Sequence, residues 1–293
     1  MCLYPQDLGL FAYKNNVPRF VPCGHCVECL EARASEWALR VMDEVSLTDL
    51  SCMITLTYRD APEGLKKAHL QQFIKDLRKR LDRIGVKIRY FGCGEYGSKG
   101  GRPHYHVIIF GWQPSDIRPF FKRKGHDVYI SNFVSEVWKK GYITVEAVTY
   151  HSAKYCAKYL QKFSDVGDKQ PPFVLMSLKP GIGAGAIDLS KIRSDGKIVR
   201  EGKEYNVPRY YRKVIERARG DYFKELFARR LERSRKVYPD FAKLELRRQK
   251  VAKFSKKLSQ KLLTSKEERA MIEAQERKEL VKSLRMREGS QVR

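Results

Sequence analysis

The chain has 293 residues, of which 59 are Lys or Arg and 34 are Asp or Glu, so its formal net charge is +25 at neutral pH. This charge predicts a polyanionic partner, with nucleic acid as the first candidate and an anionic membrane surface as the second. The length allows one substantial core with an extension. No apolar run approaches the ~18 residues that cross a membrane, and no secretion signal opens the chain, so no membrane partner is expected.

A cysteine cluster is the first motif along the chain, with Cys23, Cys26 and Cys29 spaced three residues apart. Seven cysteines, an odd number, in a chain without an export signal favour reduced thiols over a disulfide framework. The spacing lets several thiolates converge on one ion, and a structural Zn2+ would take Cys2, or His25 in its place, as a fourth ligand. Unliganded cysteines in a turn stay an open alternative, as does an iron–sulfur cluster, although the usual closing Cys-Pro is missing.

The following elements alternate between strands and helices. Residues 51–58 are rich in β-forming side chains and end at a turn with Pro62, which predicts a strand. Apolar residues at helical spacing between Leu70 and Leu81 predict an amphipathic helix with a basic outer surface. The further elements expected are a helix at 30–41 ahead of this unit, strands at 86–93 and 103–112, a helix near 132–139, a strand at 142–148 and a helix within 150–163.

The order strand–helix–strand–strand–helix–strand predicts an α+β fold of the split βαβ type, similar to ferredoxin or RRM domains, with an antiparallel sheet and helices on one face. Residues 164–210 look less regular, and their glycine-rich run at 181–185 lacks the Gly-Lys-Ser/Thr of a P-loop, so no ATPase is expected. Between Pro239 and Gly289 there is neither glycine nor proline. That stretch predicts a long basic helix or a helical hairpin, whose charge favours contact with nucleic acid.

Two histidines stand near the start of the strand at 103–112. His104 and His106 are two residues apart, so their side chains point to the same face of the sheet. Taken alone, such a pair is more often hydrogen-bonded structure than a metal site. If the strands at 86–93 and 103–112 form a hairpin, however, Glu95 returns beside His104. These three residues then form a metal site with open positions, as a Lewis-acid metal requires.

The helix that follows carries two tyrosines, Tyr155 and Tyr159, four residues apart. Its apolar residues form a stripe at helical spacing, namely Ala153, Cys156, Ala157, Leu160 and Phe163. A tyrosine that packs in the core would lie in this stripe, and neither of these two does. We therefore expect both phenols to face a polar cleft as functional groups, with neighbouring lysines suited to phosphate charge.

Basic and aromatic side chains elsewhere are candidates for DNA contact. The basic helix near residues 68–84 and the C-terminal tail are expected to follow phosphates, and Tyr58 and Tyr96 can stack on unpaired bases, although sheet packing is the more ordinary role of each tyrosine. The basic residues assigned to DNA binding are Lys75, Arg78, Lys79, Lys154 and Lys162.

With Glu95, His104-Tyr-His106 and Tyr155-Cys-Ala-Lys-Tyr159, the chain resembles the HUH endonucleases that initiate rolling-circle replication, in which the tyrosines follow the histidines. Further motifs narrow the resemblance to the replication initiation proteins of microvirus, gokushovirus-like, single-stranded DNA phages. These motifs are Pro22-Cys-Gly-His-Cys-Val-Glu-Cys29, Ile54-Thr-Leu-Thr-Tyr58, Gly94-Glu-Tyr-Gly97, Pro180-Gly-Ile-Gly183 and Pro208-Arg-Tyr-Tyr211. The similarity runs from about Cys2 to Tyr211.

The resemblance implies a metal-dependent nickase and ligase for single-stranded DNA at a replication origin. It implies that the histidines and Glu95 hold Mg2+ or Mn2+, that Tyr155 and Tyr159 alternate as nucleophiles through a 5′-phosphotyrosine intermediate, and that Lys158 stabilises phosphate or phenolate. It also implies work with the host helicase and polymerase in the host bacterial cytoplasm. The alternatives are an HUH tyrosine transposase and a non-catalytic split βαβ protein that binds nucleic acid.

Four segments are expected on this basis. Residues 1–48 carry the cysteine cluster and a helix that packs on the core, residues 49–165 form the HUH endonuclease core, residues 166–238 extend that core in an irregular, basic form, and residues 239–293 form a basic helical tail.

Overall fold

The computed structural model describes residues 2–9, 19–97, 101–123, 125–158, 169–193, 197–200, 202–219 and 239–253. The chain divides into two compact units, the first comprising residues 1–2 and 6–237 and the second residues 3–5 and 238–293. In the second unit residues 241–253 are helical, as predicted for the start of the tail, and the rest of the predicted tail helix lies outside the described residues. Among the described residues, no helix combines the length and apolarity needed to cross a membrane.

An antiparallel sheet of seven strands dominates the first unit, with the order β6-β7-β8-β3-β5-β4-β9. The strands are β3 (Ser51–Thr57), β4 (Arg89–Tyr96), β5 (Pro103–Phe110), β6 (Arg118–Arg123), β7 (His126–Ile130), β8 (Ile143–Glu146) and β9 (Phe173–Met176). The four central strands β8-β3-β5-β4, with α3 (Lys67–Asp82) and α4 (Asn132–Trp138) between them along the chain, have the predicted split βαβ order, which confirms the α+β class. The hairpin β6–β7 and strand β9 extend the sheet at its two edges and were not predicted.

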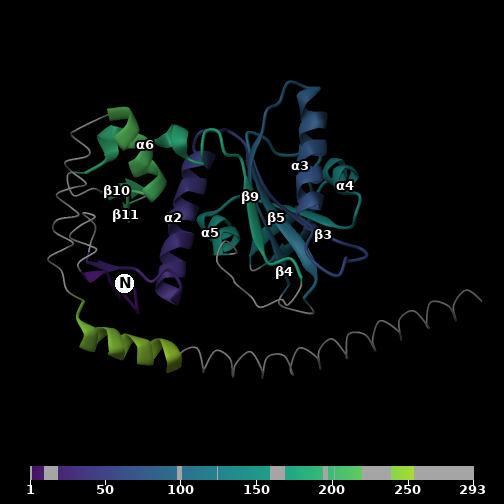
Figure 1. The fold of residues 1–293 in the computed structure, drawn as a ribbon. Helices are drawn as coiled ribbons and strands as arrows, with labels where there is room; N and C mark the ends of the chain where they lie inside the picture. Colours follow the sequence, from purple (N-terminus) through teal and green to yellow (C-terminus); the bar gives the residue numbers. More distant parts are fainter. Residues whose placement is uncertain are drawn as a thin grey trace, which may run out of the picture. The chain divides into compact units, whose positions relative to one another are not determined.

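Helices cover both faces of this sheet, which corrects the expectation of a single helical face. Helices α3 and α4 pack on one face, around Leu70, Phe73 and Trp138. Helices α2 (Val27–Val45) and α5 (Tyr150–Lys158) pack on the other face, around Ala38 and Ala153. Figure 1 shows the sheet between these two layers. The reason lies in β3, whose five inner residues are all buried, because a strand with apolar side chains on both faces needs cover on both.

The segment after β9 packs against the C-terminal half of α2. It contains the hairpin of β10 (Lys197–Arg200) and β11 (Lys203–Asn206), followed by α6 (Arg209–Arg219). The buried Arg40 donates to the carbonyl of Ile182, and the Tyr211 hydroxyl donates to Asp43. The two motifs Pro180–Gly183 and Pro208–Tyr211 therefore meet on α2 and join this segment to the core.

Replacing Gly183 with alanine is expected to lower the free energy of unfolding by about 3 kcal/mol. Gly183 has φ +76°, and a Cβ atom there would clash with the Tyr211 hydroxyl and lie 2.6 Å from the Arg40 carbonyl oxygen. The matched control is Gly85→Ala, since Gly85 has φ +73° with nothing within 4 Å. The control isolates backbone strain and should cost about 1 kcal/mol. Urea unfolding measures both variants, and equal midpoints would contradict the close packing of the two motifs.

Candidate metal and tyrosine site

The register of the β4–β5 hairpin brings the predicted carboxylate and imidazoles together. Glu95 pairs with His104 and Cys93 with His106, so the three side chains share the face that α2 and α5 cover. Glu95 Oε1 lies 2.8 Å from His104 Nε2 and 2.9 Å from His106 Nε2. Glu95 is almost completely buried, with 1% of its surface exposed. One carboxylate oxygen and two ring nitrogens thus converge on one point beneath α5.

The outer nitrogens of both rings are held by partners on the strands. His104 Nδ1 donates to the carbonyl oxygen of Arg102 at 3.1 Å, and His106 Nδ1 lies 2.9 Å from Thr55 Oγ1 on β3. A neutral His104 fixed in this way directs the lone pair of Nε2 at Glu95 Oε1, so a cation has to lie between them. Partners on the outer nitrogen are the usual support of histidine ligands to metals.

The second oxygen of Glu95 supports the same conclusion. Glu95 Oε2 is buried and has no hydrogen-bond partner among the described residues. A buried carboxylate oxygen without a partner is costly unless a cation compensates it. The three ligand atoms, all within 4.8 Å of one another, therefore fit a single divalent ion with open positions.

The electrostatics of the cluster separate the two histidines. Burial raises the pKa of Glu95, but hydrogen bonds from His104 and His106 outweigh this effect and lower it to about 2. Burial disfavours the charged form of His104, yet its bonds to Glu95 and the Arg102 carbonyl raise its pKa overall. Burial lowers the pKa of His106. In the metal-free protein the proton that bridges to Glu95 therefore belongs to His104.

Tyr155 lies at the same point. Its hydroxyl donates to Glu95 Oε1 at 2.8 Å, and its ring centre is 5.3 Å from that of His106 in an edge-on arrangement. The residue is 44% exposed, so the site opens to solvent on this side. As the sequence predicts, the stripe of Ala153, Cys156 and Ala157 is buried, and Tyr155 lies outside it. Burial and the charge of Glu95 raise the pKa of Tyr155, so the phenol is protonated without a metal ion.

Other predicted residues lie elsewhere. Lys154 and Lys158 both form ion pairs with Glu31 on α2, so Lys158 is directed to α2 and its carboxylate partner. Tyr159 and Lys162 lie outside the described residues. The exposed Lys75, Arg78 and Lys79 belong to α3, which covers the opposite face of the sheet from Glu95.

The two tyrosines considered for base stacking have structural partners. Tyr58 is only 4% exposed, and its hydroxyl lies 2.6 Å from the Tyr105 hydroxyl. The Tyr96 hydroxyl donates to the carbonyl of Gln170 and accepts from the backbone N–H of Leu65. Both tyrosines therefore pack in the sheet and loops, in the more ordinary of the two roles expected for them.

Comparison with known proteins places this site in a family. The family model for the ORF2 type of replication-associated protein matches residues 51–164, which contain Glu95, both histidines and Tyr155. The replication-associated protein ORF2 of Spiroplasma virus 4 is 32% identical over 223 residues, which cover 69% of this chain and 70% of the relative. The chain belongs to the family of phage replication-associated proteins.

Two other relatives agree with this assignment. The replication-associated protein VP4 of Bdellovibrio phage phiMH2K is 34% identical over 70% of this chain and 68% of its own length. The replication-associated protein ORF4 of Chlamydia phage 1 is 32% identical over 67% of this chain and 54% of its own length. No solved structure matches this replication-associated protein.

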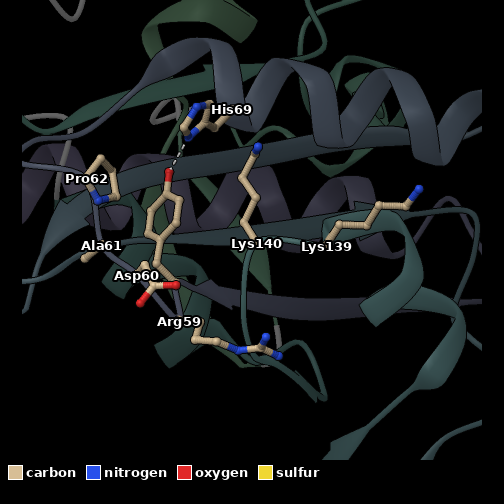
Figure 2. A pocket seen from close by; sticks show the side chains of 8 residues that line it. Arg59, Asp60, Ala61, Pro62, His69, Lys139 and Lys140 are labelled. Atoms are coloured by element: carbon tan, nitrogen blue, oxygen red, sulfur yellow. Dashed lines mark hydrogen bonds between the residues drawn. The ribbon is translucent and has the colours of Figure 1, made fainter.

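Sequence reasoning missed a basic pocket of this replication-associated protein where β3 ends. The pocket has a volume of about 380 Å³ and is lined by Tyr58, Arg59, Asp60, Ala61, Pro62, His69, Lys139 and Lys140. His69 Nδ1 lies 2.6 Å from the Tyr58 hydroxyl, and Lys140 reaches to the same side as His69, whereas Lys139 extends away (Figure 2). Burial and the charges of Lys140 and Lys66 lower the pKa of His69. Positive charge thus gathers here, one residue beyond the strand end where Thr57 pairs with His104.

Thr55 is the second residue that sequence reasoning missed. Its place opposite His106 depends on the β3–β5 register, which sets Thr55 against His106 and Thr57 against His104. A threonine within a run of β-forming residues gives no local signal of this role, because only the pairing partner defines it.

The affinity of this replication-associated protein for Mn2+ is expected to fall at least about tenfold from pH 8 to pH 5.5. A proton on His104 competes with the metal for Nε2, and the pKa of His104 is raised above its usual value of about 6.5. Protonation therefore increases as the pH falls through that range, while Glu95, with a pKa of about 2, stays ionised. Titration calorimetry at the two pH values measures the effect, and an affinity independent of pH would argue against His104 as a ligand.

Proposed function

We propose that this replication-associated protein is a metal-dependent HUH endonuclease that nicks and rejoins single-stranded DNA to initiate rolling-circle replication of a phage genome. The observation that carries the proposal is the convergence on Glu95 Oε1 of two imidazole nitrogens and one phenol, each within 2.9 Å. A protein that only binds nucleic acid has no use for a buried carboxylate, two imidazoles and a phenol at one point.

Glu95, His104 and His106 would hold the ion, and the donor set of one carboxylate and two imidazoles with open positions suits Mg2+ or Mn2+. When bound, the ion would polarise the scissile phosphodiester and offset the charge that keeps the Tyr155 phenol protonated. Thr55 and the Arg102 carbonyl fix the two rings in orientation. These contacts prepare the site before DNA arrives.

Tyr155 is the proposed nucleophile that the described residues contain. Its oxygen forms a bond to phosphorus while the bond from phosphorus to the 3′ oxygen breaks, and the departing 3′ oxygen takes a proton. Glu95 orients the phenol, but a carboxylate with a pKa of about 2 is a poor base, so the phenolic proton passes to solvent at the exposed side of the ring. The phosphotyrosine bond retains the free energy of the phosphodiester, so a 3′ hydroxyl can reverse the step without ATP.

The substrate needs an accessible backbone, which single-stranded or extruded origin DNA provides. The basic pocket beside Arg59 and Lys140 continues the strand end that carries His104, and it is the nearest described concentration of positive charge suited to a neighbouring phosphate. Lys75, Arg78 and Lys79 face away from the metal site on α3, so any DNA they bind lies beyond the cleavage point. The host helicase and polymerase would then use the free 3′ hydroxyl in the host bacterial cytoplasm.

The proposed division of labour follows the chain. Residues 49–165 would carry the endonuclease chemistry, residues 1–48 and 166–238 would support it, and residues 239–293 would bind DNA through their basic surface.

The test is covalent capture. The full chain is incubated with labelled single-stranded oligonucleotides from the phage origin and Mn2+, and the products are separated under denaturing conditions. We expect a protein–DNA adduct that requires the metal and appears together with a free 3′ hydroxyl fragment. DNA binding without an adduct or cleavage under any divalent ion would favour a non-catalytic nucleic-acid-binding protein.

A further inference from the structure

The cysteines of the N-terminal segment form a second compact ligand group, far along the chain from the residues of the tyrosine site. The Sγ atoms of Cys2, Cys23, Cys26 and Cys29 all lie within 4.8 Å of one another. Cys23 and Cys29 are separated by 4.0 Å and Cys26 and Cys2 by 3.9 Å, and none of the seven cysteines forms a disulfide. A tetrahedral ion with bonds of ~2.3 Å to sulfur sets its four ligands about 3.8 Å apart. The thiols therefore already stand at the spacing of one such ion.

Backbone donors support thiolates in this cluster. The N–H of Cys23 points to Cys2 Sγ at 3.2 Å, and the N–H of Cys26 points to Cys23 Sγ at 3.4 Å. Such bonds stabilise the negative charge that sulfur carries as a metal ligand. His25 does not belong to the group of converging ligand atoms, so the fourth ligand is Cys2.

We propose that these four cysteines hold one Zn2+ in a closed thiolate shell, and that this ion fixes the N-terminal end of α2 and thereby positions the helix that carries Tyr155. Thiolates select soft ions over Mg2+ and Mn2+, and four of them leave no open position for substrate, so the site is structural. An iron–sulfur cluster would hold the thiolates further apart, because inorganic iron and sulfide atoms lie between them.

The ion would act on α2 through its first turn. Cys26 is the N-cap residue of α2 and makes no side-chain capping hydrogen bond, and Cys29 lies in the first turn. A helix end without a side-chain cap frays more readily. Two ligands of the same ion, one on either side of the helix start, would hold this turn in place.

Helix α2 passes this restraint to α5. Glu31, two residues after Cys29, forms ion pairs with both Lys154 and Lys158 of α5. Further along, small residues of α2 and α5, including Ala34 and Ala157, share one buried cluster. The described part of α5 is nine residues long, and a helix of this length depends on packing for its orientation. The position of the Tyr155 phenol thus depends on α2.

Metal content of the full chain tests the site itself. A variant with Glu95, His104 and His106 all changed to Ala, purified without chelators, should retain about one zinc ion per chain by elemental mass spectrometry. Cys23→Ser with Cys26→Ser should lose it, and the control Cys52→Ala, which removes a buried cysteine outside the cluster, should keep it. Iron in place of zinc, or a zinc content unchanged in the double cysteine variant, would overturn the assignment.

Cobalt gives a readout that does not depend on how the cysteine variants fold. Wild-type protein exchanged with Co2+ should show the thiolate-to-cobalt charge-transfer band and the intense d–d bands of a tetrahedral site. Spectra of a six-coordinate Co2+ without the thiolate band would contradict the four-cysteine shell. The inference stands apart from the endonuclease proposal, because neither measurement involves DNA.

Hydrogen exchange tests the coupling to α5. Removing the zinc from wild-type protein should increase amide exchange in the first turns of α2 and in the peptide containing Tyr155. Glu31→Gln should increase exchange in the Tyr155 peptide while the zinc content stays unchanged. Unchanged exchange at Tyr155 in both cases would show that the metal supports α2 alone and would overturn the positioning role.

Discussion

Replacing both Tyr155 and Tyr159 with phenylalanine is expected to abolish the denaturant-resistant adduct between this protein and a single-stranded origin oligonucleotide. The change removes only the two hydroxyl groups, and the attack on phosphorus requires a phenol oxygen. The Tyr155 hydroxyl donates to Glu95 Oε1, and Tyr159 follows four residues later, about one helical turn along the sequence. Each single variant should keep part of the activity, because the remaining phenol can still attack.

The matched control is Tyr150→Phe. Tyr150 lies at the start of α5, where its ring contacts the rings of His151 and Tyr205 rather than the Glu95 carboxylate. This variant should form the adduct at the wild-type level. The double variant should still bind the oligonucleotide, so that the lost adduct reflects chemistry. An adduct of undiminished yield in the double variant would refute both tyrosines as nucleophiles.

His106→Ala should reduce metal-dependent cleavage by at least about 100-fold, since even the loss of a residue that only supports a metal ligand costs up to that factor. The substitution removes the ring nitrogen 2.9 Å from Glu95 Oε1 and leaves the buried carboxylate with one imidazole. Binding of single-stranded DNA should persist and weaken with salt, because it depends on Lys and Arg contacts to phosphate. Cleavage in a gel assay over a range of Mn2+ concentrations measures the effect.

Two further variants separate the metal role from folding. His106→Gln retains a side chain of similar length in the buried position, and it should lose cleavage as well. His151→Ala removes an exposed histidine of α5 and should cleave normally. Normal cleavage by His106→Ala at low Mn2+ would exclude His106 as a ligand.

Much of the core could be predicted from the order and periodicity of the elements. Alternation along the strand placed His104 and His106 on one face, and the hairpin brought Glu95 to them, because a two-residue period fixes the side of every residue once the strands pair. Helical spacing placed Tyr155 outside the buried stripe of α5. These features depend on local sequence, which a single chain reveals.

The features that were missed depend on contacts distant in sequence. Glu31 takes Lys154 and Lys158, although helical spacing alone suggested that Lys158 would serve the phenol. Thr55 meets His106 only through pairing of β3 with β5. The second helical layer follows from burial on both faces of β3, which its run of apolar residues permits but does not require. Partners of this kind become apparent only when tertiary structure is known.

Identifying the residue that becomes joined to DNA tests the proposed chemistry without any substitution. After reaction of the full chain with an origin oligonucleotide and Mn2+, nuclease and protease digestion leaves a peptide that carries a nucleotide, and tandem mass spectrometry locates the modified side chain. We expect a 5′-phosphate on Tyr155 or Tyr159. A nucleotide attached to a serine, to a lysine or to a tyrosine outside this helix would show that the phenols beside Glu95 are not the nucleophiles.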